Sequence, residues 1–185
     1  MVRTLSVEAE RFPLAAAFTI SRGSKTEAAV LTCTITDGTN AGRGECVPYA
    51  RYGETPGSVR DEIEAARTVV ERGISRHDLL TAMKPGAARN AVDCALWDLE
   101  AKAGMVPARA LAGMPAPRPL ETAYTITLGD ADAMAAQARA NAGRPLLKVK
   151  VGTGDDVGRI EAVAAAAPQS RILLDANEGW SPDNL

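Results

Sequence analysis

The feature that most constrains the fold is a repeat in the last third of the chain, where strand-like segments alternate with alanine-rich segments. The strand centres lie near Tyr124, Lys148 and Leu173, about 24 residues apart, and residues 130–142 and 155–166 between them are typical of helices. A helix of this length carries the chain back to the same edge of a sheet, so that successive strands run parallel. The repeat therefore predicts parallel β/α units.

The parallel pattern begins after a proline-rich boundary. Pro115, Pro117 and Pro119 interrupt regular structure there, because proline cannot donate a backbone hydrogen bond. Eight β/α units close into a barrel of roughly 200 to 250 residues, but only about 65 residues follow Leu120. We therefore interpret residues 116–185 as an incomplete barrel domain and the chain as the first part of a longer protein.

A different pattern precedes the boundary and predicts a separate α+β domain at residues 1–115. Residues 2–10, 27–36 and 42–47 are typical of strands, and Asp37–Asn40 is a turn signal, so we expect an antiparallel meander.

Three helices are expected after this meander. The first runs from an N-cap at Ser58 to Arg72, with Gly73 at its end, and the second spans about Ser75–Met83. The third has the clearest helical period and ends near Gly104. Its apolar face consists of Ala88, Ala91, Val92, Ala95, Leu96 and Leu99.

Composition excludes several classes of partner. The chain has 21 basic and 23 acidic residues, which are interspersed, so we expect neither a nucleic acid nor a membrane partner. No apolar run reaches the ~18 residues of a membrane span, and the start of the chain does not resemble an export signal. Cys33, Cys46 and Cys94 lack metal-site spacing, so we expect reduced thiols in a cytoplasmic protein.

Two lysines on one strand are the strongest indication of chemistry. Lys148 and Lys150 point to one face of their strand, while the apolar residues between and around them point to the other. Asp175 and Asn177 end the next strand, and the carboxyl ends of barrel strands carry the chemistry. Asp175 is therefore a candidate ligand for Mg²⁺, which prefers oxygen. From spacing alone, a simple ion pair between Asp175 and a lysine remains the alternative.

Taken together, these residues resemble the enolase superfamily, and within it the muconate-lactonizing subgroup and its L-Ala-D/L-Glu (dipeptide) epimerases. The resemblance runs from about Thr19 to Trp180 and depends on six segments in this order. They are Ser21–Ser24, Gly44–Tyr49, Arg51–Glu54, Gly86–Leu99, Lys148–Lys150 and Asp175–Asn177.

The resemblance implies an α/β fold, in which an α+β capping domain precedes a modified TIM barrel of (β/α)7β type, truncated here. It implies that Lys150 is the general acid/base and that Lys148 binds the substrate carboxylate and favours the neutral form of Lys150. Asp175 would be the first of three carboxylate ligands to Mg²⁺, with Asn177 in support. Arg22 would contact the substrate's side-chain carboxylate, and Thr125 would line the same pocket. The other two metal ligands and a second lysine would lie on later strands.

The implied activity is epimerisation of an anionic dipeptide, such as L-Ala-D/L-Glu from peptidoglycan turnover, by a possible homo-oligomer. An α-proton beside a carboxylate is far less acidic than a lysine ammonium, so metal and lysine charges must stabilise the enediolate. Alternatives with the same fold are a cycloisomerase, an o-succinylbenzoate synthase and an N-acylamino acid racemase. A fragment that binds metal or a partner without catalysis is a further alternative.

Overall fold

The computed structural model describes residues 2–183, which form two compact units. Within the described residues, the first unit consists of residues 2–12 and Glu27–Pro117. The second unit takes Pro13–Thr26 together with those from Arg118 onward. The segment Pro13–Thr26 is the tip of a β-hairpin, so a stretch from the start of the chain groups with the later strands. The expected domain division at residue 115 stays a prediction.

The first unit contains the sheet β1–β2–β3 except for the outer parts of β1 and β2, which lie in the hairpin tip. Its strands are β1 (Thr4–Ile20), β2 (Gly23–Thr36) and β3 (Ala41–Cys46), and β2 and β3 pair antiparallel, as the meander predicts. The strand expected at residues 2–10 is longer than predicted and continues to Ile20. Phe12, Leu14, Phe18 and Ile20 alternate along this extension, but Pro13 interrupts the run, and proline in a segment argues against a strand.

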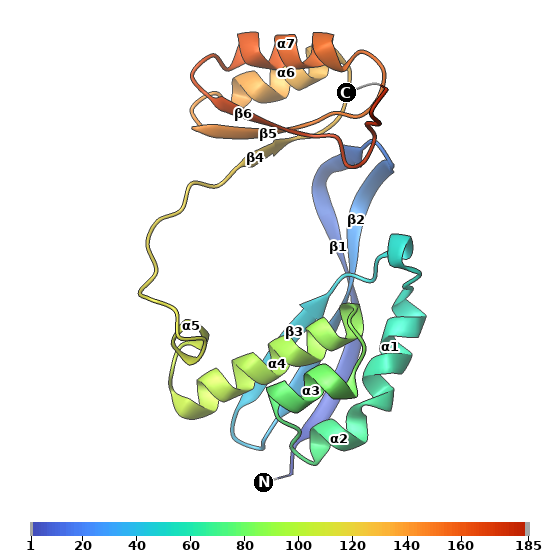
Figure 1. Ribbon diagram of the computed structural model, residues 1–185, viewed down its shortest axis with the longest axis vertical. Helices are drawn as coiled ribbons and strands as arrows, with labels where there is room; N and C mark the ends of the chain where they lie inside the picture. Colours follow the sequence, from blue (N-terminus) through green and yellow to red (C-terminus); the bar gives the residue numbers. More distant parts are fainter. Residues whose placement is uncertain (1, 184–185) are drawn as a thin grey trace. The chain divides into compact units, whose positions relative to one another are not determined.

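Helices cover one side of this sheet (Figure 1). A short 3-10 turn, η1 (Ala50–Tyr52), precedes them. The helices over the sheet are α1 (Pro56–Ala65), α2 (Arg67–Glu71), α3 (Arg76–Ala82) and α4 (Ala87–Gly104), and the short α5 (Ala108–Leu111) follows the end of α4.

The prediction that Ser58 is the N-cap of the first helix is wrong. Thr55 is the N-cap, and its hydroxyl accepts a hydrogen bond from the Ser58 amide at 3.0 Å while the Ser58 hydroxyl accepts one from the Thr55 amide. The helix begins earlier because Pro56 fits its first position, where no backbone donor is needed.

Helix α4 is the centre of the first core. The six apolar residues predicted to face inward are all buried. The helix lies unusually close to β3, since a Cβ placed on Gly44 would be 2.0 Å from the Ala91 carbonyl oxygen. Only glycine allows that approach, and any larger residue would push helix and strand apart.

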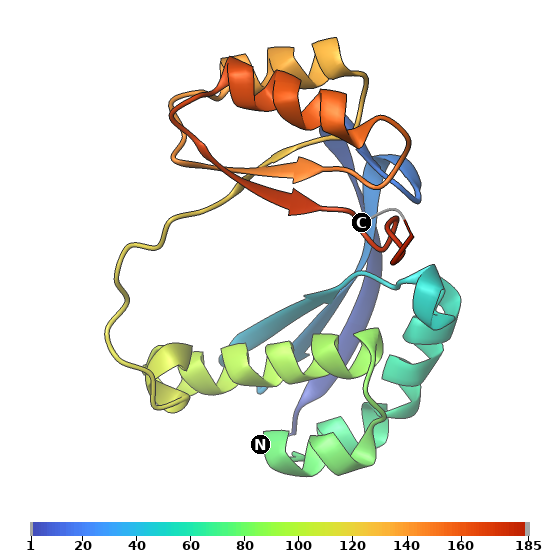
Figure 2. The same cartoon turned by 45° about the horizontal axis from the view of Figure 1, so that its top comes forward.

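The second unit contains a parallel sheet in the order β4–β5–β6, as the repeat predicts. Its strands are β4 (Tyr124–Ile126), β5 (Leu146–Lys150) and β6 (Arg171–Asp175). The helices α6 (Ala131–Ala140) and α7 (Asp156–Ala166) lie side by side over the same face of this sheet (Figure 2). Its core consists of Ile126, Met134, Ala138, Leu147, Val149, Val151, Val163 and Ala167.

Within residues 2–183, no helix combines the length and the apolar character that crossing a membrane requires.

Candidate active site

Strand β5 presents its two lysines on the face opposite the core. Leu147 and Val149 are fully buried beneath α6 and α7, whereas the alternating pleat points Lys148 and Lys150 the other way. Only 6% of the Lys150 side chain is exposed, compared with 35% of the Lys148 side chain. Lysine is rarely buried without a partner, so Lys150 requires an anion or acceptors nearby.

Asp175 provides that anion. The strand register places Asp175 directly beside Lys150, and one carboxylate oxygen, Oδ2, accepts hydrogen bonds from Lys148 Nζ at 2.7 Å and from Lys150 Nζ at 2.8 Å. These bonds from Lys148 and Lys150 hold the pKa of Asp175 well below its usual range, against the opposing effect of burial. The carboxylate is therefore ionised, and two ammonium groups share one negative charge. The remaining positive charge favours an anionic ligand.

Asn177 completes the contacts of Lys150. Its side-chain oxygen accepts a hydrogen bond from Lys150 Nζ at 2.7 Å, and its backbone amide donates to Asp175 Oδ1 at 2.9 Å. Lys148, Lys150, Asp175 and Asn177 thus form one cluster at the carboxyl ends of β5 and β6.

The hairpin tip brings Arg22 to the same end of the sheet. Arg22 Nη1 donates to the Asn177 carbonyl at 2.9 Å and forms an ion pair with Glu178 at 3.4 Å, and the Ser21 hydroxyl donates to the Ala176 carbonyl at 3.0 Å. The ring of Phe18 lies 5.7 Å from Lys150 Nζ. The tip is therefore held on the loop that follows β6.

Two threonines of β4 and the turn after it face this region. Thr125 lies opposite Lys148 in the register of β4 and β5. The Thr127 hydroxyl accepts a hydrogen bond from the Thr19 amide at 2.6 Å and donates to the Thr19 carbonyl at 3.0 Å, which fastens the hairpin tip. The sequence did not single out Phe18 or Thr127, because their contacts join segments that are far apart along the chain.

Asp175 has the chemistry of a metal ligand but is a single carboxylate. Within residues 2–183, no three His, Cys, Asp or Glu side chains gather as a metal site would require. A carboxylate has about four lone-pair positions, so its three hydrogen bonds leave capacity for a hard cation. The described residues therefore fit Mg²⁺ as a partial site that needs further oxygen ligands.

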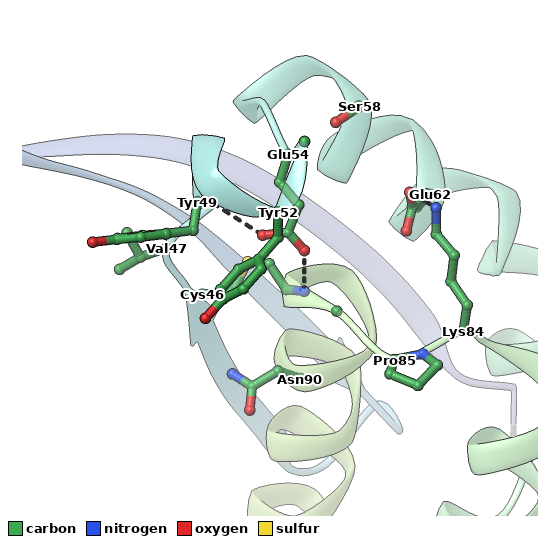
Figure 3. A pocket seen from close by; sticks show the side chains of 13 residues that line it. Cys46, Val47, Tyr49, Tyr52, Glu54, Ser58, Glu62, Lys84, Pro85 and Asn90 are labelled. Carbon is green, nitrogen blue, oxygen red and sulfur yellow. Dashed lines mark hydrogen bonds and ion pairs between the residues drawn. The ribbon is translucent and has the colours of Figure 1, made fainter. Parts of the chain in front are cut away.

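A cavity of about 800 Å³ lies in the first unit, between the loop before α1 and the start of α4 (Figure 3). Tyr49 and Tyr52 line it, and the Glu54 carboxylate accepts hydrogen bonds from the backbone amides of Tyr49 at 3.0 Å and Ala87 at 2.7 Å. Lys148, Lys150 and Asp175 are not among the described residues that line this cavity. The cavity and the charged cluster are thus separate features.

Comparison with known proteins identifies the relatives of the chain. Residues 2–113 match the mandelate racemase / muconate lactonizing enzyme N-terminal domain. The chain is 39% identical over 186 residues to the L-Ala-D/L-Glu epimerase of Escherichia coli (strain K12). The match covers 100% of this chain and 58% of that protein. It is 35% identical over 155 residues to an N-acetyl-D-glutamate racemase of Pseudoalteromonas. That match covers 82% of this chain and 48% of that protein.

Solved structures agree with this relationship. An enolase family member from Agrobacterium tumefaciens with homology to dipeptide epimerases, bound to sodium and L-Ala-L-Glu, is 58% identical with a TM-score of 0.95. The match covers 99% of this chain and 56% of that one. A dipeptide epimerase from Cytophaga hutchinsonii complexed with Mg and D-Ala-L-Val is 28% identical with a TM-score of 0.88, over 100% of this chain and 54% of that one. The chain thus spans about half the length of its relatives. With the family's N-terminal domain and the beginning of its barrel, the chain belongs to the mandelate racemase / muconate lactonizing enzyme family of the enolase superfamily.

Proposed function

We propose that this chain is the first part of a Mg²⁺-dependent dipeptide epimerase that acts on an anionic dipeptide such as L-Ala-D/L-Glu. The observation that carries the proposal is the cluster in which Lys148 and Lys150 share the carboxylate of Asp175 at the ends of two parallel strands. Relatives that are epimerases and racemases support it.

Lys150 is the proposed acid/base. Its ammonium is almost fully buried and held by Asp175 and Asn177, so its position is fixed before a substrate binds. It would remove the α-proton from one face of the dipeptide, and the lysine on the opposite face would return a proton to the same carbon. In the reverse direction Lys150 would deliver the proton. Lys148 is more exposed, and it would bind the substrate carboxylate next to the reacting carbon.

Mg²⁺, when bound, would supply positive charge beside the substrate carboxylate, which stabilises the negative charge that develops when the α-proton leaves. Asp175 is the proposed ligand from this chain, and the Asn177 backbone amide supports it by donating a hydrogen bond to Asp175 Oδ1. The remaining ligands and the lysine for the opposite face would come from strands beyond the described part.

Arg22 is the proposed contact for the glutamate side chain of the substrate. It lies on the hairpin tip, and its guanidinium already binds a carboxylate, that of Glu178, and a carbonyl oxygen. The Agrobacterium relative is bound to L-Ala-L-Glu, which supports an anionic side chain at this position. Thr125, beside Lys148, is proposed to line the same pocket.

The second candidate is a racemase of N-acylated glutamate, which the similarity to the N-acetyl-D-glutamate racemase favours. Both reactions use the same proton transfer, and they differ in the group attached to the glutamate nitrogen. Comparing kcat/KM for L-Ala-L-Glu and N-acetyl-L-glutamate separates them.

The decisive experiment replaces Lys150 by alanine in the full-length protein and follows deuterium from D2O. We expect epimerisation to be lost in both directions. The other lysine should still exchange the α-proton of L-Ala-L-Glu without inversion, while L-Ala-D-Glu stays unlabelled. A control is Lys84→Ala, which removes a lysine paired with Glu62 in the first unit and should keep full activity. Equal labelling of both diastereomers by Lys150→Ala would contradict the role of Lys150.

A further inference from the structure

The loop that follows β6 has an energetically unfavourable backbone. Asn177 and Glu178 are consecutive and both adopt the left-handed conformation, with φ of 49° and 65°. Residues with a Cβ rarely adopt this conformation, although asparagine tolerates it better than most. Such a conformation persists only where the surroundings hold it. The loop carries Asn177, the residue whose side chain binds Lys150, so what holds the loop bears on the site.

Asp156 is the side chain that ties this loop to the loop after β5. Its Oδ2 accepts hydrogen bonds from the indole Nε1 of Trp180 at 2.8 Å and from the Gly152 amide at 2.9 Å. One carboxylate oxygen thus joins two loops that follow neighbouring strands. The side chain is 14% exposed, so water competes little for these bonds.

Arg159 extends the connection to the third strand. Its Nη1 lies 3.3 Å from Asp156 Oδ1, and its Nε donates to the Gly129 carbonyl at 2.8 Å, in the turn after β4. The carboxyl ends of β4, β5 and β6 are therefore linked through Gly129, Arg159, Asp156 and Trp180.

The two loops also touch through their backbones. A Cβ placed on Gly179 would lie 2.4 Å from the Gly152 carbonyl oxygen, and one on Gly152 would lie 2.4 Å from the Ala176 carbonyl oxygen. Because no side chains separate the loops at these glycines, the hydrogen bond between Trp180 and Asp156 can determine where the whole β6 loop lies.

We propose that Asp156 and Trp180 are positioning residues, whose hydrogen bond holds the β6 loop so that Asn177 stays on Lys150. The proposal rests on the proposed function in so far as Lys150 is the acid/base. Asp156 and Trp180 do not touch the lysine, and they act through Asn177.

A purely structural role for Asp156 and Trp180 has to be distinguished from the proposed positioning role. Asp156 also begins α7, where a carboxylate favours the helix N-terminus, and the ring of Trp180 packs against the second core. Trp180→Phe separates the two roles, because it keeps an aromatic ring and removes only the donor. Asp156→Ala removes the acceptor. Asp155→Asn is the matched control, since within the described chain the side chain of this neighbouring aspartate does not cap the helix.

The first test follows hydrogen exchange by NMR in the 185-residue chain. In Trp180→Phe and Asp156→Ala, we expect the amides of Asn177 and Gly179 and the ammonium protons of Lys150 to exchange at least about tenfold faster. Amides of α6 should be unchanged in both variants, and Asp155→Asn should match the wild type throughout. Unchanged exchange at Asn177 and Lys150 would overturn the proposal, as would an equal increase across the whole second unit, which indicates general loosening.

The second test measures epimerisation by the full-length protein. We expect Trp180→Phe to lower kcat by about tenfold or more with KM nearly unchanged, and to slow deuterium exchange from the face served by Lys150 more than from the other face. An equal loss on both faces would overturn the positioning role. If the wild type lacks turnover but the exchange changes appear, the proposed function fails while the positioning of Lys150 stands.

Discussion

The charge balance around Lys150 allows a prediction that needs no substrate or metal. Asp175→Asn keeps the size of the side chain and the Oδ1 acceptor for the Asn177 amide, but it removes the negative charge that two ammonium groups share. Lys150, with 6% of its side chain exposed, then keeps Asn177 as its acceptor but loses its counter-ion. We expect this substitution to destabilise the second unit strongly.

The magnitude follows from the geometry. Two unit charges 2.8 Å apart attract by about 6 kcal/mol at an effective dielectric constant of 20, before any cost of desolvation. Removing one partner of a buried pair typically costs about 3 to 5 kcal/mol. The pair with Lys148 adds little, because about a third of that side chain is in water. We therefore expect a loss of about 3 kcal/mol for Asp175→Asn and under about 1 kcal/mol for Lys148→Met.

Urea unfolding of the 185-residue chain without divalent cations measures these changes. Trp180 lies in the second unit and Trp97 in the first, so fluorescence in a Trp97→Phe background reports on the second unit. The double variant Asp175→Asn/Lys150→Met should recover about 2 kcal/mol relative to Asp175→Asn, because no buried charge is then left unpaired. Equal stability of Asp175→Asn and wild type, or no recovery in the double variant, would refute the argument.

Three further predictions concern other parts of the chain. Gly44→Ala should destabilise the first unit by about 3 kcal/mol or more, because its Cβ would overlap the backbone of α4. Gly57→Ala, inside α1, should instead stabilise this unit by about 0.5 to 1 kcal/mol, and thermal unfolding measures both changes. Burial raises the pKa of Cys33 to about 12 and of Cys46 to about 11, so the contribution of these two thiols to stability should be constant below about pH 8 and should fall above it as the unfolded chain ionises them. Urea midpoints at pH 8 and 10.5 check this, and a double alanine variant of the two cysteines should lose the difference. Arg22→Met in the full-length protein should reduce the preference for glutamate over uncharged second residues by about 10-fold or more in kcat/KM, and an unchanged preference across a dipeptide panel would exclude Arg22 from substrate binding.

Local patterns in the sequence predicted most of the secondary structure. The inward face of α4 follows from its helical period, and the parallel strands of the second unit follow from the spacing of apolar segments. The errors come from places where local signals compete or are weak. Ser58 and Thr55 are both good N-cap residues, and Pro56 decides between them. The outer half of β1 has apolar residues at alternate positions, but Pro13 lies within it and weakens the strand signal.

The cluster of Lys148, Lys150, Asp175 and Asn177 was predictable in its members but not in its contacts. Alternation along β5 places Lys148 and Lys150 on one face, and the strand repeat brings Asp175 beside them. The bond between Lys150 and Asn177 depends on a left-handed backbone, which the sequence does not specify uniquely. The bond between Asp156 and Trp180 joins residues 24 positions apart in two loops, and no periodic signal marks such a pair.

The membership of Pro13–Thr26 in the second unit affects how the parts of such a protein can be exchanged. The strand segments on either side of this hairpin tip lie in the first unit, so neither unit is a continuous stretch of chain. A chimera joined at the proline-rich segment would therefore transfer the hairpin tip along with the capping part. Arg22 would come from the parent that provides residues 1–117. Asn177 and Glu178, which Arg22 binds, would come from the other parent. Substrate preference in such chimeras should then follow the donor of the first part, although the lysines come from the other parent.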